Sequence, residues 1–396
     1  MSSSKRLFEY FSKSAFYIKI SKFAAIILFL IFSISCVIIF RNDITVENIQ
    51  LLTKFITLDG SSSHYSDEFS VTVKEESDVI MLRDNVAIIN NNNISLHDLS
   101  GRKLFSYNYS MTSPAVAHDD HYILIYDIGE KEACVFNSFS KIKTFKFDFP
   151  IYSADIRGDY VAFVTGNDLS RSSLSVYKFD NREKDYVLNY NKLFDKFINN
   201  ASLSDNGKNV LVSSVSSNNG KYDCNIMIFD CQSDSSTPSE TYSTVELPIK
   251  TYFNSNASNA LSVTDSSVHF FDKNLDVNNS YLFNQSKVSS FYFDNNYLVI
   301  SEKNNLAGNS NKITIFSSEG NTVRTINIPD EIYDITIGHK YIYALGKEGV
   351  YRYSVLENNK SDDTVFPIEA RYHSIICDTA DNCYLVGYTL ISKVNF

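Results

Sequence analysis

The chain has 396 residues and a formal net charge of −10, with 26 Tyr, 29 Phe, no Trp and only 13 Gly. Its first 22 residues are +4, so the remainder is −14; the charges in this first segment are Glu9 against Lys5, Arg6, Lys13, Lys19 and Lys22. An acidic remainder argues against a nucleic-acid-binding protein, which needs a basic face to neutralise phosphates. The abundance of aromatic residues favours strands over helices.

The first predicted element is an apolar stretch, Phe23–Phe40, which holds 18 residues without a charge between Lys22 and Arg41. As a helix it would measure about 27 Å, enough to cross the hydrocarbon layer of a membrane. Five bases precede it, the asymmetry expected when the N-terminus stays in the cytoplasm. Because no small-x-small cleavage site follows, we expect an uncleaved anchor rather than a secretory signal, with a buried core helix as the alternative.

The next segment, residues 41–66, links this span to the rest of the chain. Apolar residues at Val46, Ile49, Leu52 and Phe55 recur at helical spacing, which predicts a short juxtamembrane helix. The stretch Gly60–His64 (GSSSH) reads as a flexible joint. The expected order is therefore a cytoplasmic basic tail at 1–22, a transmembrane helix at 23–40, a juxtamembrane helix and flexible joint at 41–66, and an extracytoplasmic domain at 67–396.

From Asp67 onward the sequence repeats a hairpin of two strands around a polar turn. Eight copies are visible, roughly 36 to 51 residues apart; they begin at Val79, Ala115, Ala154, Ala201, Tyr252, Phe291, Asp334 and Ser374. A third alternating strand follows most hairpins, as in Ser173–Glu183, and a fourth often follows that, as in Lys143–Phe149. Four strands per unit predict the blades of a β-propeller.

Two intervals between the units are long. A Ser/Asp/Thr/Pro-rich stretch between Cys231 and Thr244 and an Asn-rich stretch at Asn304–Asn311 account for the extra residues. Their composition predicts exposed loops.

The last unit is short of one strand, and an unpaired strand, Phe69–Lys74, precedes the first hairpin. Pairing the two would complete the last blade and remove two exposed strand edges. We therefore predict an all-β propeller of eight four-stranded blades, with seven as the alternative.

The basic tail, the single span, the juxtamembrane stretch Arg41–Leu52 and the Tyr/Phe/Asn-rich repeats together resemble a family of membrane-anchored propeller proteins of unknown function from the Clostridia and related low-GC Gram-positive bacteria. The resemblance implies location and fold and carries over no functional residues. The hairpins are also similar to WD40-like and quinoprotein-like propellers. The Trp and Gly signatures of both are missing, so we expect no quinone and no other cofactor.

The densest group of candidate metal ligands is His118, Asp119, Asp120 and His121. Imidazole and carboxylate ligands suit zinc. The group lies in a hairpin turn, however, where polar residues are expected in any case, and no further ligand can be named. We regard these four residues as weak metal candidates, and the sequence assigns no catalytic or cofactor-binding residue.

Acidic residues recur at equivalent hairpin turns, at Asp119, Asp159, Asp205, Asp294 and Asp381. Gathered on one rim, they would hold calcium or a basic partner. Repeated Asp in tight turns is explained more simply by hydrogen bonds from the side chain to the backbone, and we favour that interpretation.

Five of the six cysteines lie outside the predicted span, so at least one is unpaired in the chain. Cys377 and Cys383 flank the turn of the eighth hairpin and would face each other across it. If any disulfide forms, we expect it between these two residues.

The common hydrolase and nucleotide-binding motifs are absent from the sequence. We expect a non-catalytic binding or scaffolding module, held outside the cell membrane, for an envelope protein or wall polymer. The alternatives are an extracytoplasmic hydrolase or lyase with a site near the propeller axis, and a ligand-sensing ectodomain.

Overall fold

The computed structural model describes residues 21–23, 26–35, 68–74, 77–180, 182–233, 237–254, 258–283, 287–294, 296–304, 310–356, 363–369, 372–378 and 380–396. The chain divides into two compact units, Met1–His64 and Tyr65–Phe396. In the first unit, residues 21–23 and 26–35 are helical. Among the described residues, no helix combines the length and the apolarity needed to cross a membrane. The predicted span at 23–40 and the joint at 41–66 lie partly or wholly outside those residues.

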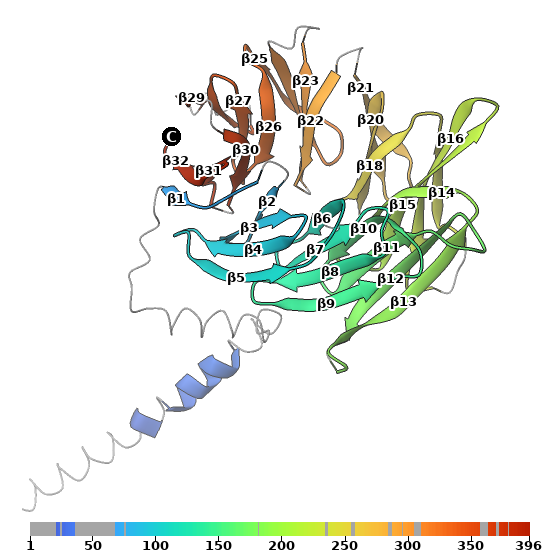
Figure 1. Ribbon diagram of the computed structural model, residues 1–396, viewed down its shortest axis with the longest axis horizontal. Helices are drawn as coiled ribbons and strands as arrows, with labels where there is room; N and C mark the ends of the chain where they lie inside the picture. Colours follow the sequence, from blue (N-terminus) through green and yellow to red (C-terminus); the bar gives the residue numbers. More distant parts are fainter. Residues whose placement is uncertain are drawn as a thin grey trace, which may run out of the picture. The chain divides into compact units, whose positions relative to one another are not determined.

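The second unit consists of eight four-stranded antiparallel sheets, which Figure 1 shows arranged around a common centre. These sheets are the blades of a β-propeller. We number the blades along the chain and call the strands of each blade A to D from the axis outward. In blades 1 to 4 the strands are β2 (Asp78–Leu82), β3 (Asn85–Asn90), β4 (Asn93–Asp98) and β5 (Lys103–Asn108); β6 (Pro114–His118), β7 (Tyr122–Asp127), β8 (Glu132–Asn137) and β9 (Lys141–Lys146); β10 (Ile151–Arg157), β11 (Tyr160–Thr165), β12 (Ser172–Asp180) and β13 (Asp185–Phe194); and β14 (Phe197–Leu203), β15 (Asn209–Asn218), β16 (Lys221–Asp230) and β17 (Glu240–Thr244).

Blades 5 to 7 follow the same order, and blade 8 takes its outermost strand from the other end of the chain. Their strands are β18 (Pro248–Phe253), β19 (Asn259–Thr264), β20 (Ser267–Asp272) and β21 (Val277–Leu282); β22 (Lys287–Phe293), β23 (Tyr297–Lys303), β24 (Asn311–Ser317) and β25 (Thr322–Ile328); β26 (Ile332–Ile337), β27 (Tyr341–Gly346), β28 (Gly349–Ser354) and β29 (Thr364–Pro367); and β30 (Tyr372–Cys377), β31 (Cys383–Gly387), β32 (Leu390–Val394) and β1 (Glu68–Ser70).

The sequence of each strand matches its depth in the ring. The B strands have a neighbouring blade on both faces, so they are continuous apolar runs; in β7 and β11 every residue after the first is buried. The outermost strands are far more exposed, as in β21, where five of the six residues are exposed. This gradient explains why the hairpins of strands A and B were the clearest repeats in the sequence.

The ring closes as predicted, by pairing of the two ends of the domain. Strand β1 is antiparallel to β32, with Phe69 opposite Ile391. Only Glu68–Ser70 form the strand, which is shorter than the expected Phe69–Lys74, although the N–H groups of Val71 and Val73 still bond to the B–C turn of blade 8. The eight-blade prediction is confirmed and the seven-blade alternative is wrong.

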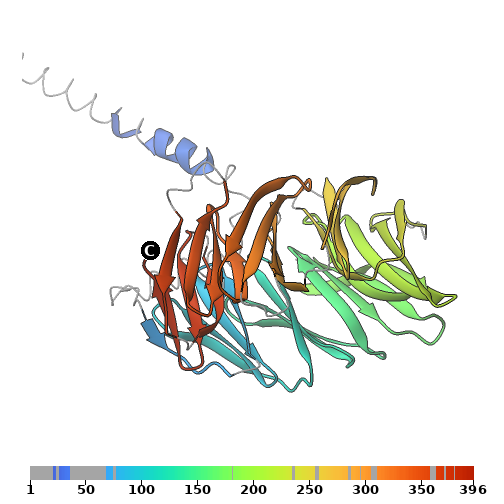
Figure 2. The same ribbon diagram turned by 90° about the horizontal axis from the view of Figure 1, so that it is seen from above.

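In the described part of the chain, the buried apolar side chains form eight clusters, and each cluster joins two neighbouring blades. The cluster between blades 8 and 1 contains Phe69 and Val73 together with Val86, Ile376 and Ile391. The core is therefore a ring of interfaces rather than one central mass. Figure 2 shows the same sheets from a direction at right angles to that of Figure 1.

Each pair of A and B strands is joined by a turn, and these turns all lie on the same side of the ring because the A strands all run in the same direction. We call this side the A–B face. The connections from strand B to strand C and from one blade to the next lie on the opposite face. Six of the eight A strands, in blades 3 to 8, also contain a β-bulge near the opposite face. Bulges bend a strand and increase its local twist.

One expected loop contains a strand. The Ser/Thr-rich stretch between Cys231 and Thr244 includes β17 (Glu240–Thr244), the outermost strand of blade 4. Its alternation of intermediate and exposed residues gives no apolar stripe, which is why its composition predicted a loop.

Candidate functional site

The four weak metal candidates lie together at the A–B turn of blade 2, as the sequence indicated. His118 ends β6 and the next three residues form the turn before β7. Among the described residues, no three His, Cys, Asp or Glu side chains converge in a way that would hold a metal ion. The structure therefore gives no support to a metal site at this turn.

Asp119 instead connects two blades. Its Oδ1 atom accepts hydrogen bonds from the N–H groups of His121 and Tyr122, both at 2.7 Å, and its Oδ2 atom accepts one from Gly158 of blade 3 at 2.6 Å. Gly158 has a φ of +52°, a conformation that favours glycine. Burial raises the pKa of Asp119 against these hydrogen bonds. The carboxylate is thus part of the ring's structure.

Two further carboxylates, Asp334 and Asp381, connect blades 7 and 8 in the same way. Asp381 accepts the N–H of Lys340 at 3.1 Å, and Asp334 accepts the Ser374 hydroxyl at 2.7 Å and the Ile375 N–H at 3.0 Å. These contacts support the interpretation that repeated Asp at the turns satisfies backbone groups. They also bond blade 7 to blade 8 at the A–B face.

A cavity of about 470 Å³ opens at the axis on the A–B face. Such a volume lies within the range of small-ligand sites. The cavity is lined by the A strands and A–B turns of blades 1, 2, 6, 7 and 8: its polar and titratable lining residues are Arg83, His118, Asp120, Tyr292, Asp294, Asp334, Thr336, His339, Ser374, Cys377 and Asp378.

A second cavity, of about 710 Å³, runs between blades 6 and 7 on the same face. Asp294 and His339 line both cavities, so the two are adjacent at this pair of residues. Val355 and Leu356 also line the second cavity, and Leu356 is half exposed. We call the first the axial cavity and the second the radial cavity.

The four carboxylates of the axial cavity divide into two kinds. Asp378 accepts bonds from the Ala380 and Asn382 N–H groups at 2.9 and 2.8 Å, and Asp334 is held as described above. Asp294 bonds only to backbone amides of its own turn, and Asp120 accepts no hydrogen bond within the described part of the chain. Two carboxylates therefore remain available to a ligand.

Burial is the main influence on the pKa values of the axial cavity. It raises the pKa of Asp294, opposed by hydrogen bonds from its turn and by nearby His339. Burial and the neighbouring Arg157 lower the pKa of His118, although this residue keeps access to solvent. The cavity therefore presents carboxyl groups that a bound cation would help to ionise.

Cys377 lines the axial cavity and lies directly opposite Cys383 in the hairpin of blade 8. Both thiols are free, and the Cys377 thiol donates to the Ile337 carbonyl at 3.5 Å. Burial raises the pKa of Cys377 to about 12 and that of Cys383 well above its usual range. Protonated thiols are poor nucleophiles, so Cys377 is not an activated catalytic cysteine. The disulfide stays a prediction.

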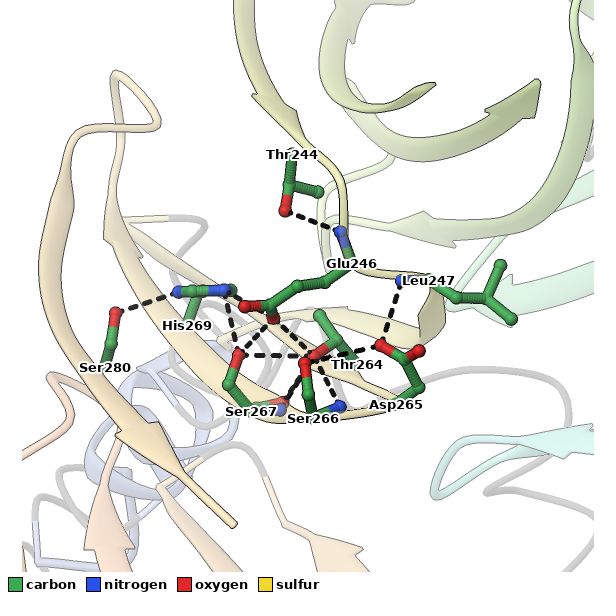
Figure 3. Close-up of polar contacts among 9 residues, drawn as sticks. All are labelled: Thr244, Glu246, Leu247, Thr264, Asp265, Ser266, Ser267, His269 and Ser280. Carbon is green, nitrogen blue, oxygen red and sulfur yellow. Dashed lines mark hydrogen bonds and ion pairs between the residues drawn. The ribbon is translucent and has the colours of Figure 1, made fainter. Parts of the chain in front are cut away.

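A second polar cluster, far from the sequence candidates, lies in blade 5 (Figure 3). The Oε2 atom of Glu246 accepts bonds from the hydroxyls of Thr264 and Ser267 and from Nε2 of His269, the last at 3.0 Å. Nδ1 of His269 is 2.8 Å from the Ser280 hydroxyl. This cluster contains the residue types of a Ser-His-Glu triad.

Its geometry is not that of a triad. A triad places the serine and the acid on opposite ring nitrogens, so that the acid orients the base. Here the Ser267 hydroxyl, at 2.9 Å, and Glu246 share the same nitrogen, Nε2. Ser280 does lie on the opposite nitrogen, but it contacts Nδ1 while the acid contacts Nε2, the reverse of the triad, in which the acid bonds to Nδ1 and the serine to Nε2. The cluster instead connects the segment between β17 and β18 to the B–C turn of blade 5. It is an anchor for blade 5.

The geometry defines this domain as an eight-bladed β-propeller with acidic turns on its A–B face. Three solved structures share the fold at low identity. BamB from Moraxella catarrhalis is 11% identical, with 83% of this chain and 96% of that chain covered and a TM-score of 0.51. Sqt1 from Saccharomyces cerevisiae is 9% identical, with 83% and 98% covered and a TM-score of 0.58. A eukaryotic initiation factor is 12% identical, with 78% and 80% covered and a TM-score of 0.54.

The chain belongs to a family described as a family of unknown function (DUF5711), whose model matches residues 61–392. No curated protein matches the sequence. At these identities the solved structures show the fold alone, so the function has to be argued from the site.

Sequence reasoning found the turns and missed the cavities. Asp120 was named only as a weak metal ligand and Asp294 only as a turn residue, while Tyr292 and His339 were not singled out for a site. The available signal was the polar positions at the ends of the A strands, since these positions meet at the axis in a propeller.

Proposed function

We propose that this protein is a non-catalytic binding module, anchored in the cell membrane by residues 23–40, whose propeller lies outside the cytoplasm. Its partner is an envelope protein or wall polymer, which binds the A–B face. The basic N-terminal tail and the apolar stretch support the location. The surface assignment rests on one observation: two adjacent cavities open on a face where side-chain carboxylates accept hydrogen bonds from backbone N–H groups of the neighbouring blade.

A face of this kind suits binding. Asp119, Asp334 and Asp381 hold neighbouring blades in register. Binding a partner therefore removes little conformational freedom from the protein, because the cavities exist before the partner arrives. Turns and loops on such a scaffold vary without cost to the core.

Site-specific photo-crosslinking in native membranes tests the surface. A photoreactive residue at Asn296, which lines the radial cavity, is expected to capture one defined envelope protein or wall fraction. The matched control carries the same group at Leu169, an 86% exposed residue on the opposite face. Equal capture from both positions, or no capture from position 296, would show that the A–B face is not the binding surface.

The location has its own test. Leu169→Cys, in a Cys377→Ser background, is expected to react with a membrane-impermeant maleimide on intact cells. The other cysteines of the described propeller are buried and give little background. Labelling that appears only after lysis would place the propeller in the cytoplasm and contradict the proposed orientation.

One observation favours a second candidate, an extracytoplasmic hydrolase or lyase. Asp294 has a raised pKa beside His339 in a cavity, which is the environment of a general acid. Purified protein that released soluble fragments from cell walls, with release abolished in Asp294→Asn, would establish this candidate over the binding module.

A further inference from the structure

The cavities also indicate which chemical group the partner presents. We propose that the axial cavity binds the guanidinium group of an arginine side chain from a protein partner, and that the residues next to this arginine occupy the radial cavity. This inference rests on the proposed binding function and names its partner class.

The first argument is the division of carboxylates. Asp334 and Asp378 accept hydrogen bonds from the ring itself, whereas Asp120 and Asp294 line the cavity from blades 2 and 6 and form no ion pair with Lys or Arg in the described part of the chain. A guanidinium carries several N–H donors in one plane, so it can bond to carboxylates that approach from different directions. A point-like ammonium is less suited to that arrangement.

The second argument is an aromatic ring in the cavity wall. Tyr292 is 37% exposed although it lies on an A strand at the axis, so part of its side chain is open to the cavity that it lines. Arginine stacks on exposed aromatic faces more readily than other cations do.

The third argument is the shape of the whole site. The radial cavity continues from Asp294 and His339 to Val355 and half-exposed Leu356 between blades 6 and 7. An extended peptide with an arginine at the axis would place its neighbouring residues along this path, with an apolar side chain near Leu356. A wall polymer with amino groups offers the charge without the planar donors or the apolar contact.

The cavity also contains groups that oppose a cation. Arg83 lies on the blade 1 side, and His118 and His339 would repel a guanidinium if protonated. Binding is therefore expected to weaken as the pH falls and His118 and Asp294 take up protons. Asp294 comes from blade 6, next to His339, and Arg83 comes from blade 1, so these two charged groups line the cavity from different blades.

The test uses the full-length chain in detergent micelles and measures binding by ligand-observed NMR. The probes are N-acetylarginine amide, N-acetylcitrulline amide, which keeps the shape and loses the charge, and glucosamine, which carries the amine of a wall polymer. We expect the arginine probe to bind at least tenfold more tightly than the other two. Asp294→Asn and Asp120→Asn are each expected to weaken arginine binding about tenfold, because each removes a charge-assisted hydrogen bond.

Asp168→Asn is the matched control, since Asp168 is exposed on the opposite face and should leave binding unchanged. Exposed Asp120 keeps the test valid if Asp294→Asn folds poorly. Equal binding of arginine and citrulline, tighter binding of glucosamine, or an equal effect of Asp168→Asn would overturn the inference. If the photoreactive residue at position 296 captured a partner but the arginine probe did not bind, the arginine inference would be wrong and the proposed function would stand.

Discussion

At the scale of single residues, a carboxylate in an A–B turn of this ring has one of two uses. Both carboxylate oxygens of Asp119 accept hydrogen bonds from backbone N–H groups, one of which belongs to the next blade. Asp294 occupies the equivalent turn of blade 6, where its hydrogen bonds to described residues all lie within that turn, and it lines two cavities. The same residue type at the same repeat position is therefore structural in one blade and available to a ligand in another.

The raised pKa of Asp294 predicts a stability effect with a definite sign. Burial makes the ionised form costly, so this group favours folding below the pKa of the unfolded chain and loses that contribution as the pH rises through the folded pKa. Asp294→Asn keeps a side-chain oxygen as acceptor and removes the charge. We expect it to be more stable than the parent at pH 7 and to lose this advantage below about pH 4.

Urea denaturation from pH 3 to pH 8 measures this difference. Asp168→Asn, on the exposed opposite face, should show none. An Asp294→Asn advantage that grew toward low pH would contradict the assigned shift.

At the scale of elements, the connections between blades depend on a few anchors. Asp330 precedes blade 7 and accepts the N–H of Glu348 at 2.8 Å and the hydroxyl of Tyr351 at 3.0 Å. Asp127 of blade 2 accepts N–H groups from the preceding connection, and Glu246 has the same role in blade 5. Acids on the opposite face thus hold the connections into blades 2, 5 and 7.

The Glu246 anchor predicts a pH dependence opposite to that of Asp294. Burial opposes its charge, but bonds from Ser267, Thr264 and His269 outweigh it and lower the pKa of Glu246. A depressed folded pKa adds stability above the unfolded pKa, and this is lost as the pH falls through the folded pKa. Glu246→Gln is therefore expected to destabilise the protein at pH 7, by about 1 kcal/mol, and to have less effect near pH 3.

Denaturation at the two pH values checks this. The exposed neighbour Val245→Ala serves as the control, since it is 70% exposed and lacks these contacts. A loss that is equal at both pH values would rule out the charged form as the source of the stability.

The hairpin of blade 8 predicts a disulfide under oxidising conditions. Cys377 and Cys383 are directly opposite, one step beyond the hydrogen-bonded pair Asp378 and Asn382. Such a position is a non-hydrogen-bonded pair, where side chains approach most closely. We expect a Cys377–Cys383 bridge in oxidised protein, with a stabilisation of about 2 kcal/mol over the reduced form.

Peptide mapping after alkylation of free thiols would detect the bridge. Cys134, which is buried in blade 2, should remain free in the same sample. Alkylation of both Cys377 and Cys383 in oxidised, unfolded protein would refute it.

At the scale of the whole molecule, the ring is stabilised by interfaces and is closed by a single short strand. Phe69 of β1 is 6% exposed and packs in the cluster between blades 8 and 1. Gly101 of blade 1 approaches it so closely that a Cβ there would lie 2.6 Å from the Phe69 Cβ. Loss of this contact would weaken the closure of the whole ring.

Phe69→Ala is accordingly expected to lower the free energy of unfolding by about 3 kcal/mol or more and to promote association through the exposed edge of β32. Val365→Ala, at a 57% exposed position on the outermost strand of blade 7, should change it by less than about 0.5 kcal/mol. Urea denaturation and size-exclusion chromatography measure the two effects. Closure would be independent of β1 if Phe69→Ala behaved like the control.

Much of the fold was predictable because its signals are local. Strand alternation, apolar B strands such as Tyr160–Thr165 and polar turns such as Arg157–Asp159 are properties of neighbouring residues. The exception was Glu240–Thr244, since an outermost strand needs no apolar stripe. The candidate site was less predictable: turn position alone does not distinguish Asp119 from Asp294.

The sequence by itself determined the strands, the number of blades and the way the ring closes, because hydrophobic period and turn chemistry act over a few residues. Only the tertiary structure decided which turns share a cavity. Asp120 and Asp294 come from blades far apart in the chain, and their meeting at the axis depends on the packing of every blade between them.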